Sequence, residues 1–354
     1  MNIKFLSFTV FYLYLSIFVL VAQVPQYYTN IDFTLQGDQL KNELSELVSD
    51  THTNLIPYTS SSTDTWDVLR ISDLVDVDSN NVLLIYGYDD TDESTKNDRT
   101  RNIYSNQSGS CIGYWNREHV FAKSLANPSL VTNQPGPGTD IHNLRSADCQ
   151  MNSTRNNRLF VNGSGNSGTS GSYFFPGDEF KGDVARIIMY MYLRYPSQCE
   201  PLNIGVGSSS YSQNADIPDL FLDWNDQDPV SEFELNRNDV IYSYQGNRNP
   251  FIDNPYLATL IWNGPITTDS WGVLSVSGIT NDNLTVYPTI TDDYLYISGI
   301  INEQYSVKIF NQLGQALEVE VSNNRIDVSK FSSGVYILKL HQLNQVQQTK
   351  FFVR

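Results

Sequence analysis

Apolar residues recur at helical spacing in two segments of the chain, residues 34–52 and 178–195. Side chains three and four positions apart share one face of a helix, so this spacing predicts an amphipathic helix in each segment. Pro196 follows the second segment, and proline is common just after a helix ends. The apolar positions are Leu35, Leu40, Leu44, Leu47 and Val48 in the first helix and Val184, Ile187, Ile188 and Met191 in the second.

The pattern changes near Gly264. Beyond residue 284, short apolar runs alternate with turn residues, which is typical of a small all-β sandwich of about 70 residues. We therefore expect a first domain at residues 23–264, a linker at 265–282 and a β-sandwich at 283–354. The first domain mixes expected helices with short expected strands.

The middle of the first domain has the pattern strand, loop, strand, helix. Residues 117–121 are expected to be extended, and residues 133–139 contain two Pro-Gly pairs that predict a loop. A second extended piece follows at residues 141–144, and Ser146 is a candidate cap for the next helix. In that helix Asn152 and Arg155, which are three residues apart, would share one face.

Three further segments have a recognisable character. Residues 82–86 form a short apolar run that predicts a strand. Residues 162–172 are rich in Gly, Ser and Asn and predict a flexible loop. Residues 244–253 are dense in turn residues and predict an ordered loop, packed by Phe251 and Ile252.

Residues 1–22 have the composition of a secretory signal peptide. Lys4 gives a weakly positive start, residues 5–21 are almost entirely apolar, and Ala22 is a small residue suited to cleavage. A single membrane anchor is the alternative, but residues 23–30 contain no basic stop-transfer cluster. We expect an exported protein without a membrane span in its mature form.

Cysteine usage agrees with export, because an oxidising compartment allows disulfides. The chain has three cysteines, Cys111, Cys149 and Cys199. One disulfide would leave one odd thiol, and the sequence leaves open which two residues pair. The alternative is that all three are small buried residues.

The net charge of −17 argues at first against a polyanionic partner. The charge is unevenly distributed, however. Residues 96–200, which carry the polar motifs, hold 11 basic and 8 acidic residues, so the acidity lies elsewhere. A modest local positive field is compatible with nucleic acid as a partner.

The candidate chemistry lies in the sequence Tyr-Trp-Asn-Arg-Glu-His-Val-Phe, residues 114–121. Its histidine, His119, can accept a proton from water near neutral pH. The carboxylate of Glu118 and the amide of Asn152 suit a hard divalent metal. Neighbouring residues of a strand face opposite sides, so directing Glu118 and His119 at one atom would require a distortion. The alternative is a buried histidine beside a surface glutamate.

Two other interpretations of the motif region have to be weighed. His142 could be a second catalytic histidine, but a structural histidine inside a loop is the commoner case. A zinc site could be formed by two cysteines and two histidines, although the spacings differ from the short pairs of structural zinc. Its ligands would be Cys111, His119, His142 and Cys149.

These motifs occur in the order in which a known family has them. Residues 116–121, 140–148 and 152–157, together with residues 228–230 and 245–253, resemble the bacterial endonuclease I family of secreted nucleases. The resemblance covers roughly residues 27–262 and implies an α+β fold with a His-Me finger, a ββα-metal unit.

The resemblance also implies roles for individual residues. His119 would be the general base, and Glu118 and Asn152 would hold one divalent metal, with Mg²⁺ favoured over Ca²⁺ or Mn²⁺. Arg145 or Arg155 would hold the phosphate. The implied substrate is DNA, with RNA as a second candidate, and the implied products carry 5′-phosphates. No residue that reads bases is apparent, so low sequence specificity is expected.

The C-terminal region resembles a second family. Residues 286–288, 307–315, 326–329 and 333–340 are similar to the C-terminal sorting domain of the type IX secretion system. The resemblance implies that the outer-membrane secretion machinery is a partner. The alternative is a β-sandwich that binds carbohydrate or another protein.

The hypothesis is therefore a secreted, monomeric, metal-dependent endonuclease with a sorting domain. A catalytically inactive binding or adhesion protein on a nuclease scaffold is the alternative from another class. A phosphodiesterase for small or lipid phosphates is a third possibility, which a closed apolar pocket would favour.

Overall fold

The computed structural model describes residues 24–106, 111–273, 285–298 and 305–354, the last range without residues 313, 318, 320, 323, 343 and 344. The chain divides after Leu274 into two compact units. The predicted signal peptide at residues 1–22 lies outside the described residues. Within the described residues, no helix is long and apolar enough to cross a membrane.

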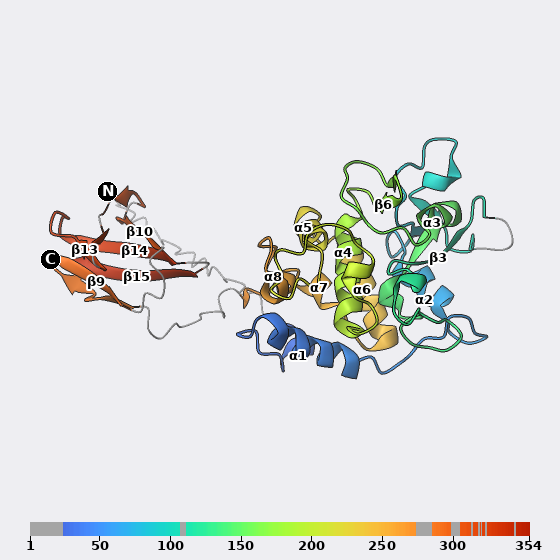
Figure 1. Cartoon of the computed structure of the whole chain (residues 1–354), viewed down its shortest axis with the longest axis horizontal. Coiled ribbons are helices and arrows are strands. Elements are labelled where there is room, and N and C mark those ends of the chain that lie inside the picture. Colours follow the sequence, from blue (N-terminus) through green and yellow to red (C-terminus); the bar gives the residue numbers. More distant parts are fainter. Residues whose placement is uncertain are drawn as a thin grey trace, which may run out of the picture. The chain divides into compact units, whose positions relative to one another are not determined.

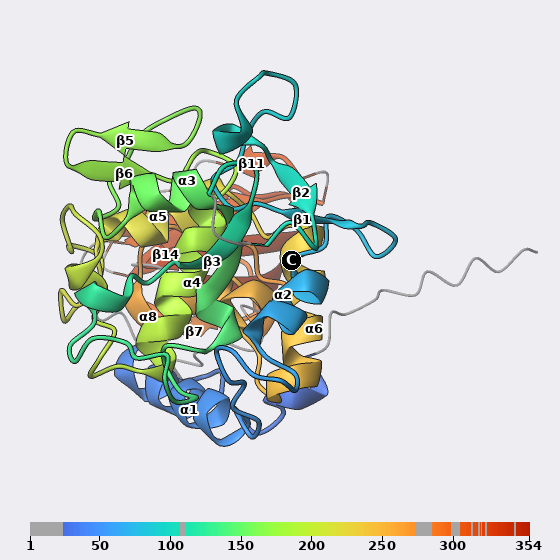
Figure 2. The ribbon, with the colours of Figure 1, turned by 90° about the vertical axis from the view of Figure 1, so that its right-hand side faces the viewer.

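In the first unit helices outweigh strands, and α4 lies at its centre (Figures 1 and 2). Helix α4 contacts α1, α5 and α7, and these helices enclose most of the main hydrophobic core. The helices are α1 (Gly37–Asp50), α2 (Thr65–Ser72), α3 (Cys149–Arg155), α4 (Lys181–Arg194), α5 (Asp219–Gln227), α6 (Glu232–Gln245), α7 (Pro250–Asp253) and α8 (Tyr256–Trp262).

In the part of this unit that the structure describes, the strands form three separate antiparallel pairs, β1 with β2, β3 with β4 and β5 with β6. The pair β3–β4 is the longest, and α3 follows it directly. The strands are β1 (Asn81–Leu83), β2 (Thr100–Asn102), β3 (Trp115–His119), β4 (Leu144–Asp148), β5 (Gly168–Ser170) and β6 (Tyr173–Phe175). Helices and sheets are thus mixed, as the sequence predicts.

Both helices predicted from periodicity are present, as α1 and α4. Helix α1 buries Leu40, Leu44 and Val48 and exposes its other side, so it is amphipathic as expected. Helix α4 differs, because it is buried on all sides apart from its ends. Its polar positions are satisfied inside the protein: Arg186 forms a bidentate ion pair with Glu234 of α6.

Four local predictions are wrong. The second extended piece does not begin at residue 141, because residues 141–143 form a 3₁₀-helix and β4 begins at Leu144. Ser146 does not cap α3. The cap is Asp148, whose Oδ1 accepts from the backbone N–H groups of Gln150 and Met151. Residues 162–172 are not wholly irregular, since they contain β5. Residues 244–253 hold the last turn of α6 and the short α7. Between them, Gly246 ends α6 with φ 86°, and a Cβ there would lie 2.6 Å from the Thr51 carbonyl oxygen.

The described part of the second unit consists of two sheets around one apolar core. Their described strand pairs are antiparallel, except for the parallel pair of β15 with β8. Leu295 and Ile297 of one sheet share this core with Leu338, Leu340 and Phe351 of the other. In one sheet the strand order is β11 (Ala316–Leu317), β10 (Tyr305–Phe310), β14 (Gly334–Gln342), β15 (Gln345–Val353) and β8 (Ile290–Thr291). In the other sheet the order is β12 (Val321–Ser322), β13 (Arg325–Asp327), β9 (Tyr294–Ser298) and β7 (Thr285–Tyr287).

Part of the segment that the sequence assigned to the linker lies against the first unit. Trp271 and Val273 are buried in the main core, and the indole of Trp271 packs against Tyr28 with ring centroids 4.6 Å apart. Residues 265–273 therefore contribute to the core of the first unit.

Candidate active site

The site is built on β3, β4 and α3. Strands β3 and β4 pair so that Glu118 lies opposite Arg145 and His119 lies opposite Leu144. Strand β4 ends at Asp148, and α3 begins at the next residue. Because no loop separates them, the register of the two strands also sets the position of α3.

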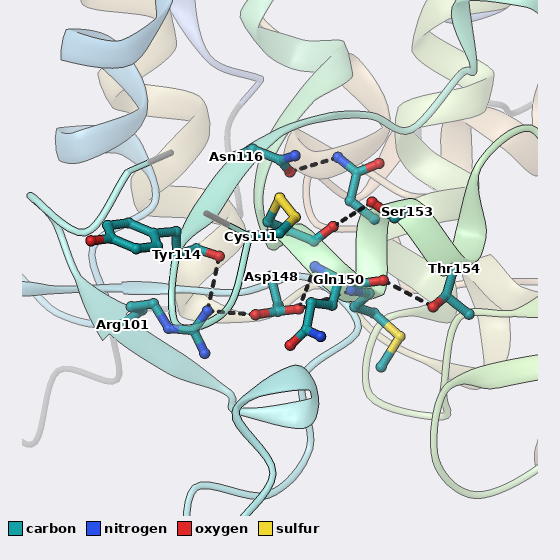
Figure 3. The surroundings of a disulfide bond; sticks show 11 residues. Arg101, Cys111, Tyr114, Asn116, Asp148, Gln150, Ser153 and Thr154 are labelled. Atoms are coloured by element: carbon teal, nitrogen blue, oxygen red, sulfur yellow. Dashed lines mark hydrogen bonds and ion pairs between the residues drawn. A yellow bond between two sulfur atoms is a disulfide. The ribbon is translucent and has the colours of Figure 1, made fainter. Parts of the chain in front are cut away.

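The start of α3 is fixed in two further ways (Figure 3). Cys111 and Cys149 form a disulfide, which ties the first residue of α3 to the segment before β3. The cap residue Asp148 accepts a 2.5 Å hydrogen bond from the buried guanidinium of Arg101. The disulfide left open by the sequence is thus Cys111–Cys149, while Cys199 is a buried free thiol.

Helix α3 is cross-linked to β3 at two points. Asn152 Nδ2 donates to Asn116 Oδ1 over 2.8 Å, and Arg155 Nη1 lies 3.2 Å from Glu118 Oε1. Residues three apart share a helix face, and residues two apart share a strand face. The polar face of α3 therefore meets the face of β3 that carries Asn116 and Glu118, and this brings Asn152 and Glu118 to the same side of β3.

The side chain of Glu118 is buried, with 2% of the residue exposed. Its Oε1 accepts a hydrogen bond from the Tyr86 hydroxyl and also forms the ion pair with Arg155. Burial raises the pKa of Glu118 to about 7, although Arg155 and Tyr86 act in the opposite direction. Tyr86 has a φ of 73°, a left-handed conformation that is costly for a bulky residue. Such strain is commonest beside functional sites, and here it accompanies the contact with Glu118.

His119 makes different contacts from its neighbour. Its Nε2 lies 2.8 Å from the carbonyl oxygen of Gly138, and its ring is stacked on that of Tyr58. Burial lowers the pKa of His119 to about 4, against the effect of the hydrogen bond to Gly138. The imidazole is therefore neutral near pH 7. Since a carbonyl can only accept, Nε2 carries the proton and Nδ1 is the basic nitrogen.

The two candidate arginines lie in different surroundings. Arg155 is at the site but fully buried, with its guanidinium donating to the carbonyl oxygens of His119 at 3.1 Å and Val120 at 2.8 Å. Arg145 is 1% exposed and donates to Asp183 of α4 at 2.6 Å. The structure thus places Arg155 against Glu118 and Asn152 against Asn116, two residues earlier on β3, and it places Arg145 in a separate buried ion network.

His142 belongs to a third, structural cluster. It is fully buried, its ring lies against that of Tyr190 with centroids 4.4 Å apart, and its backbone N–H donates to Asp140. Burial lowers its pKa to about 3. The zinc interpretation has no support, because the two cysteines are bonded to each other and no cluster of three His, Cys, Asp or Glu residues suited to a metal occurs in the described ranges.

The sequence analysis did not identify three residues that contact Glu118 or His119, namely Tyr58, Tyr86 and Gly138. Tyr86 was recognised only as the end of an apolar run, and Gly138 only as one of several turn residues. No local pattern identifies Tyr58, because it reaches His119 from a loop 61 residues earlier in the chain.

Gly138 provides a direct test of how His119 is held. A Cβ at this position would lie 2.0 Å from the carbonyl oxygen of Val131, so Gly138→Ala must displace the loop that binds His119 Nε2. Displacements near 1 Å at catalytic groups can lower rates by about 10²-fold, and we expect a loss of kcat of this order. Steady-state kinetics would measure it.

The matched control is Gly168→Ala, where a Cβ meets no atom within 4 Å. This variant should retain wild-type kcat. Equal kcat for Gly138→Ala and the wild type would show that the Gly138 carbonyl does not set the position of the imidazole.

Comparison with known proteins agrees with this architecture. Residues 36–256 match the family described as Endonuclease I, and residues 285–354 match the family described as Secretion system C-terminal sorting domain. The chain is 40% identical over 239 residues to proteins named "Extracellular ribonuclease" from Bacillus subtilis (strain 168) and Bacillus amyloliquefaciens. These matches cover 64% of this chain and 75% and 74% of the two relatives.

Both resemblances inferred from the sequence motifs are confirmed by these matches. The sorting domain and the extracellular relatives indicate a protein that acts outside the cell or at its surface. The chain belongs to the Endonuclease I family and is a secreted nuclease with a C-terminal secretion sorting domain.

Proposed function

We propose that this nuclease is a metal-dependent endonuclease that cleaves DNA, and RNA as well, with little sequence preference and leaves 5′-phosphate ends. The observation that carries the proposal is the cross-linked packing of α3 on β3, which places Asn152 beside the strand that bears Glu118 and His119. We further propose that β3, β4 and α3 are the ββα-metal unit of a His-Me finger.

His119 is the proposed general base. Its Nε2–H donates a hydrogen bond to the carbonyl oxygen of Gly138, so Nδ1 is the nitrogen that accepts the proton of the attacking water. A neutral imidazole is required for this step, and the low pKa of His119 keeps it neutral at the pH of most extracellular fluids. The hydrogen bond at Nε2 also disperses the positive charge that the ring acquires when it is protonated.

Glu118 and Asn152 are the proposed metal ligands, and their surroundings fit a hard cation. Glu118 is a desolvated carboxylate whose charge a cation would stabilise. The Asn152 amide nitrogen donates to Asn116, which leaves its oxygen as the ligand atom. One carboxylate and one amide suit Mg²⁺, which keeps several waters, while Mn²⁺ or Ca²⁺ could replace it. Bound there, the ion would neutralise charge on the scissile phosphate and the leaving oxygen.

The proposed phosphate contact changes from the sequence expectation. Arg145 and Arg155 are both buried and held by protein oxygens, so neither guanidinium faces solvent. Arg155 instead braces Glu118 and the end of β3. Lys123 is exposed, lies four residues beyond His119, and its charge acts on the imidazole. We assign Lys123 to the phosphate, as a point charge that binds any sequence alike.

Metal removal tests this function. Treatment of the secreted full-length protein with EDTA is expected to abolish cleavage of plasmid DNA and of a structured RNA, and added Mg²⁺ should restore it. The thermal unfolding temperature in EDTA must be measured alongside, to show that the chain stays folded. Cleavage that persists in EDTA would rule out the metal, and cleavage only of bis-nitrophenyl phosphate would favour a small-phosphate diesterase.

A further inference from the structure

The aromatic and basic residues beside His119 form an ordered column. The ring of Tyr58 is stacked on the imidazole of His119, with centroids 5.7 Å apart and planes inclined by 28°. The guanidinium carbon of Arg117 lies 3.4 Å from the centroid of Tyr58 and 4.1 Å from that of Trp66. The phenol ring therefore contacts both the imidazole and the guanidinium, and the guanidinium also contacts the indole.

We propose that Tyr58 and Arg117 are positioning residues that set the orientation of the His119 ring, an inference that rests on the proposed role of His119 as general base. Arg117 and His119 are two residues apart on β3 and so project to the same side. The ring of Tyr58 is a neighbour of both side chains.

The contact with Tyr58 fixes a rotation of the His119 ring that the hydrogen bond to Gly138 leaves free. A single hydrogen bond at Nε2 fixes one point of the imidazole but allows the ring to rotate about that bond. Contact of one ring face with Tyr58 removes this rotation and so fixes the direction of Nδ1. Proton transfer depends on this direction, because the base must meet the water within hydrogen-bonding distance.

Arg117 holds Tyr58 in place through hydrogen bonds as well as ring contact. Its Nη1 donates to the Tyr58 carbonyl oxygen and, over 2.9 Å, to Oγ1 of Thr65, which itself donates to the same carbonyl. Thr65 is the first residue of α2, whose start is fixed by a capping box at Asp64. The loop carrying Tyr58 is thereby tied to both β3 and α2. The guanidinium of Arg117 also lies over the rings of Tyr58 and Trp66, so its charge faces two aromatic surfaces.

The test compares Tyr58→Phe with Tyr58→Leu in the secreted full-length protein. Phenylalanine keeps the flat face, so its kcat should match that of the wild type within about twofold. Leucine keeps the bulk without the face, so kcat should fall about 10-fold or more while KM stays within about twofold. Tyr104→Leu, at an exposed tyrosine outside the site, is the matched control and should change neither constant.

A spectroscopic measurement separates positioning from general stability. The chain has four histidines, so histidine-selective isotope labelling resolves their rings by NMR. Loss of the Tyr58 ring current should shift the His119 ring resonances in Tyr58→Leu, while those of His52 and His142 stay in place. If Tyr58→Leu does not fold, Arg117→Lys provides the test instead. Lysine keeps the positive charge but loses the planar guanidinium that contacts Tyr58, so this variant should lower kcat in the same way.

Unchanged kcat in Tyr58→Leu, or an equal loss in Tyr58→Phe, would overturn the proposal. These outcomes differ from failure of the proposed function. An active wild type with an inactive His119→Ala and a fully active Tyr58→Leu would refute only the positioning role. A His119→Ala variant that keeps wild-type activity would refute the general base itself.

Discussion

Replacement of His119 by alanine is expected to lower kcat by about 10²–10⁴-fold, the range for loss of a positioned general base. The neutral ring is held at Nε2 by Gly138, whereas the ring of His142 packs against Tyr190 of α4. Substrate binding should be little affected, because the imidazole is uncharged and the proposed phosphate contact is elsewhere. Initial rates of plasmid cleavage over a range of DNA concentrations would give kcat and KM separately.

His142→Ala is the matched control for this experiment. His142 is as deeply buried but packs against Tyr190, away from β3 and α3. Its removal should lower the free energy of unfolding and leave kcat per folded molecule close to that of the wild type. A His119→Ala variant with undiminished kcat, or a His142→Ala variant that folds normally and is inactive, would show that the base is assigned to the wrong residue.

The elements that sequence alone identified are those whose signal is local. Helices α1 and α4 each have apolar residues three and four positions apart, and this period is set by helix geometry wherever the helix lies. The strand–loop–strand–helix order of the motif region also emerged, because proline and glycine mark the loop between β3 and β4. In addition, the residues that the motif groups lie on adjoining elements, with Glu118 and His119 on β3 and Asn152 on α3.

What sequence could not supply depends on contacts between distant segments. Arg145 and Arg155 are ten residues apart beside the same motif. Nothing in the neighbouring sequence shows that Arg145 belongs to a buried ion network while Arg155 contacts Glu118 at the site. The difference arises from Asp183 on α4 in one case and Glu118 on β3 in the other. In the same way, the amphipathic pattern of α4 did not reveal that its polar side faces other helices, because Glu234 lies 48 residues beyond its partner Arg186.

Replacement of Arg145 by alanine is expected to destabilise the first unit by about 3–5 kcal/mol, the range for removing one partner of a buried ion pair. Arg145 Nη1 donates to Asp183 over 2.6 Å, and its Nε lies 3.7 Å from Asp73. Burial, and then the neighbouring Glu234, raise the pKa of Asp183, so this carboxylate depends on Arg145 to stay ionised. Urea unfolding followed by circular dichroism would give the change in free energy, with exposed Lys123→Ala as a control that should leave stability nearly unchanged.

The double variant Arg145→Met with Asp183→Leu distinguishes a structural role from a role in catalysis. Replacing both partners of a buried ion pair with apolar residues of similar volume is often neutral or stabilising, so the double variant should recover most of the stability lost in Arg145→Met alone. If the ion pair only supports the fold, the double variant should also cleave plasmid DNA with wild-type KM and kcat. A stable double variant with a raised KM would instead show that Arg145 contacts the phosphate, which would require the buried network between β4 and α4 to open when the substrate binds.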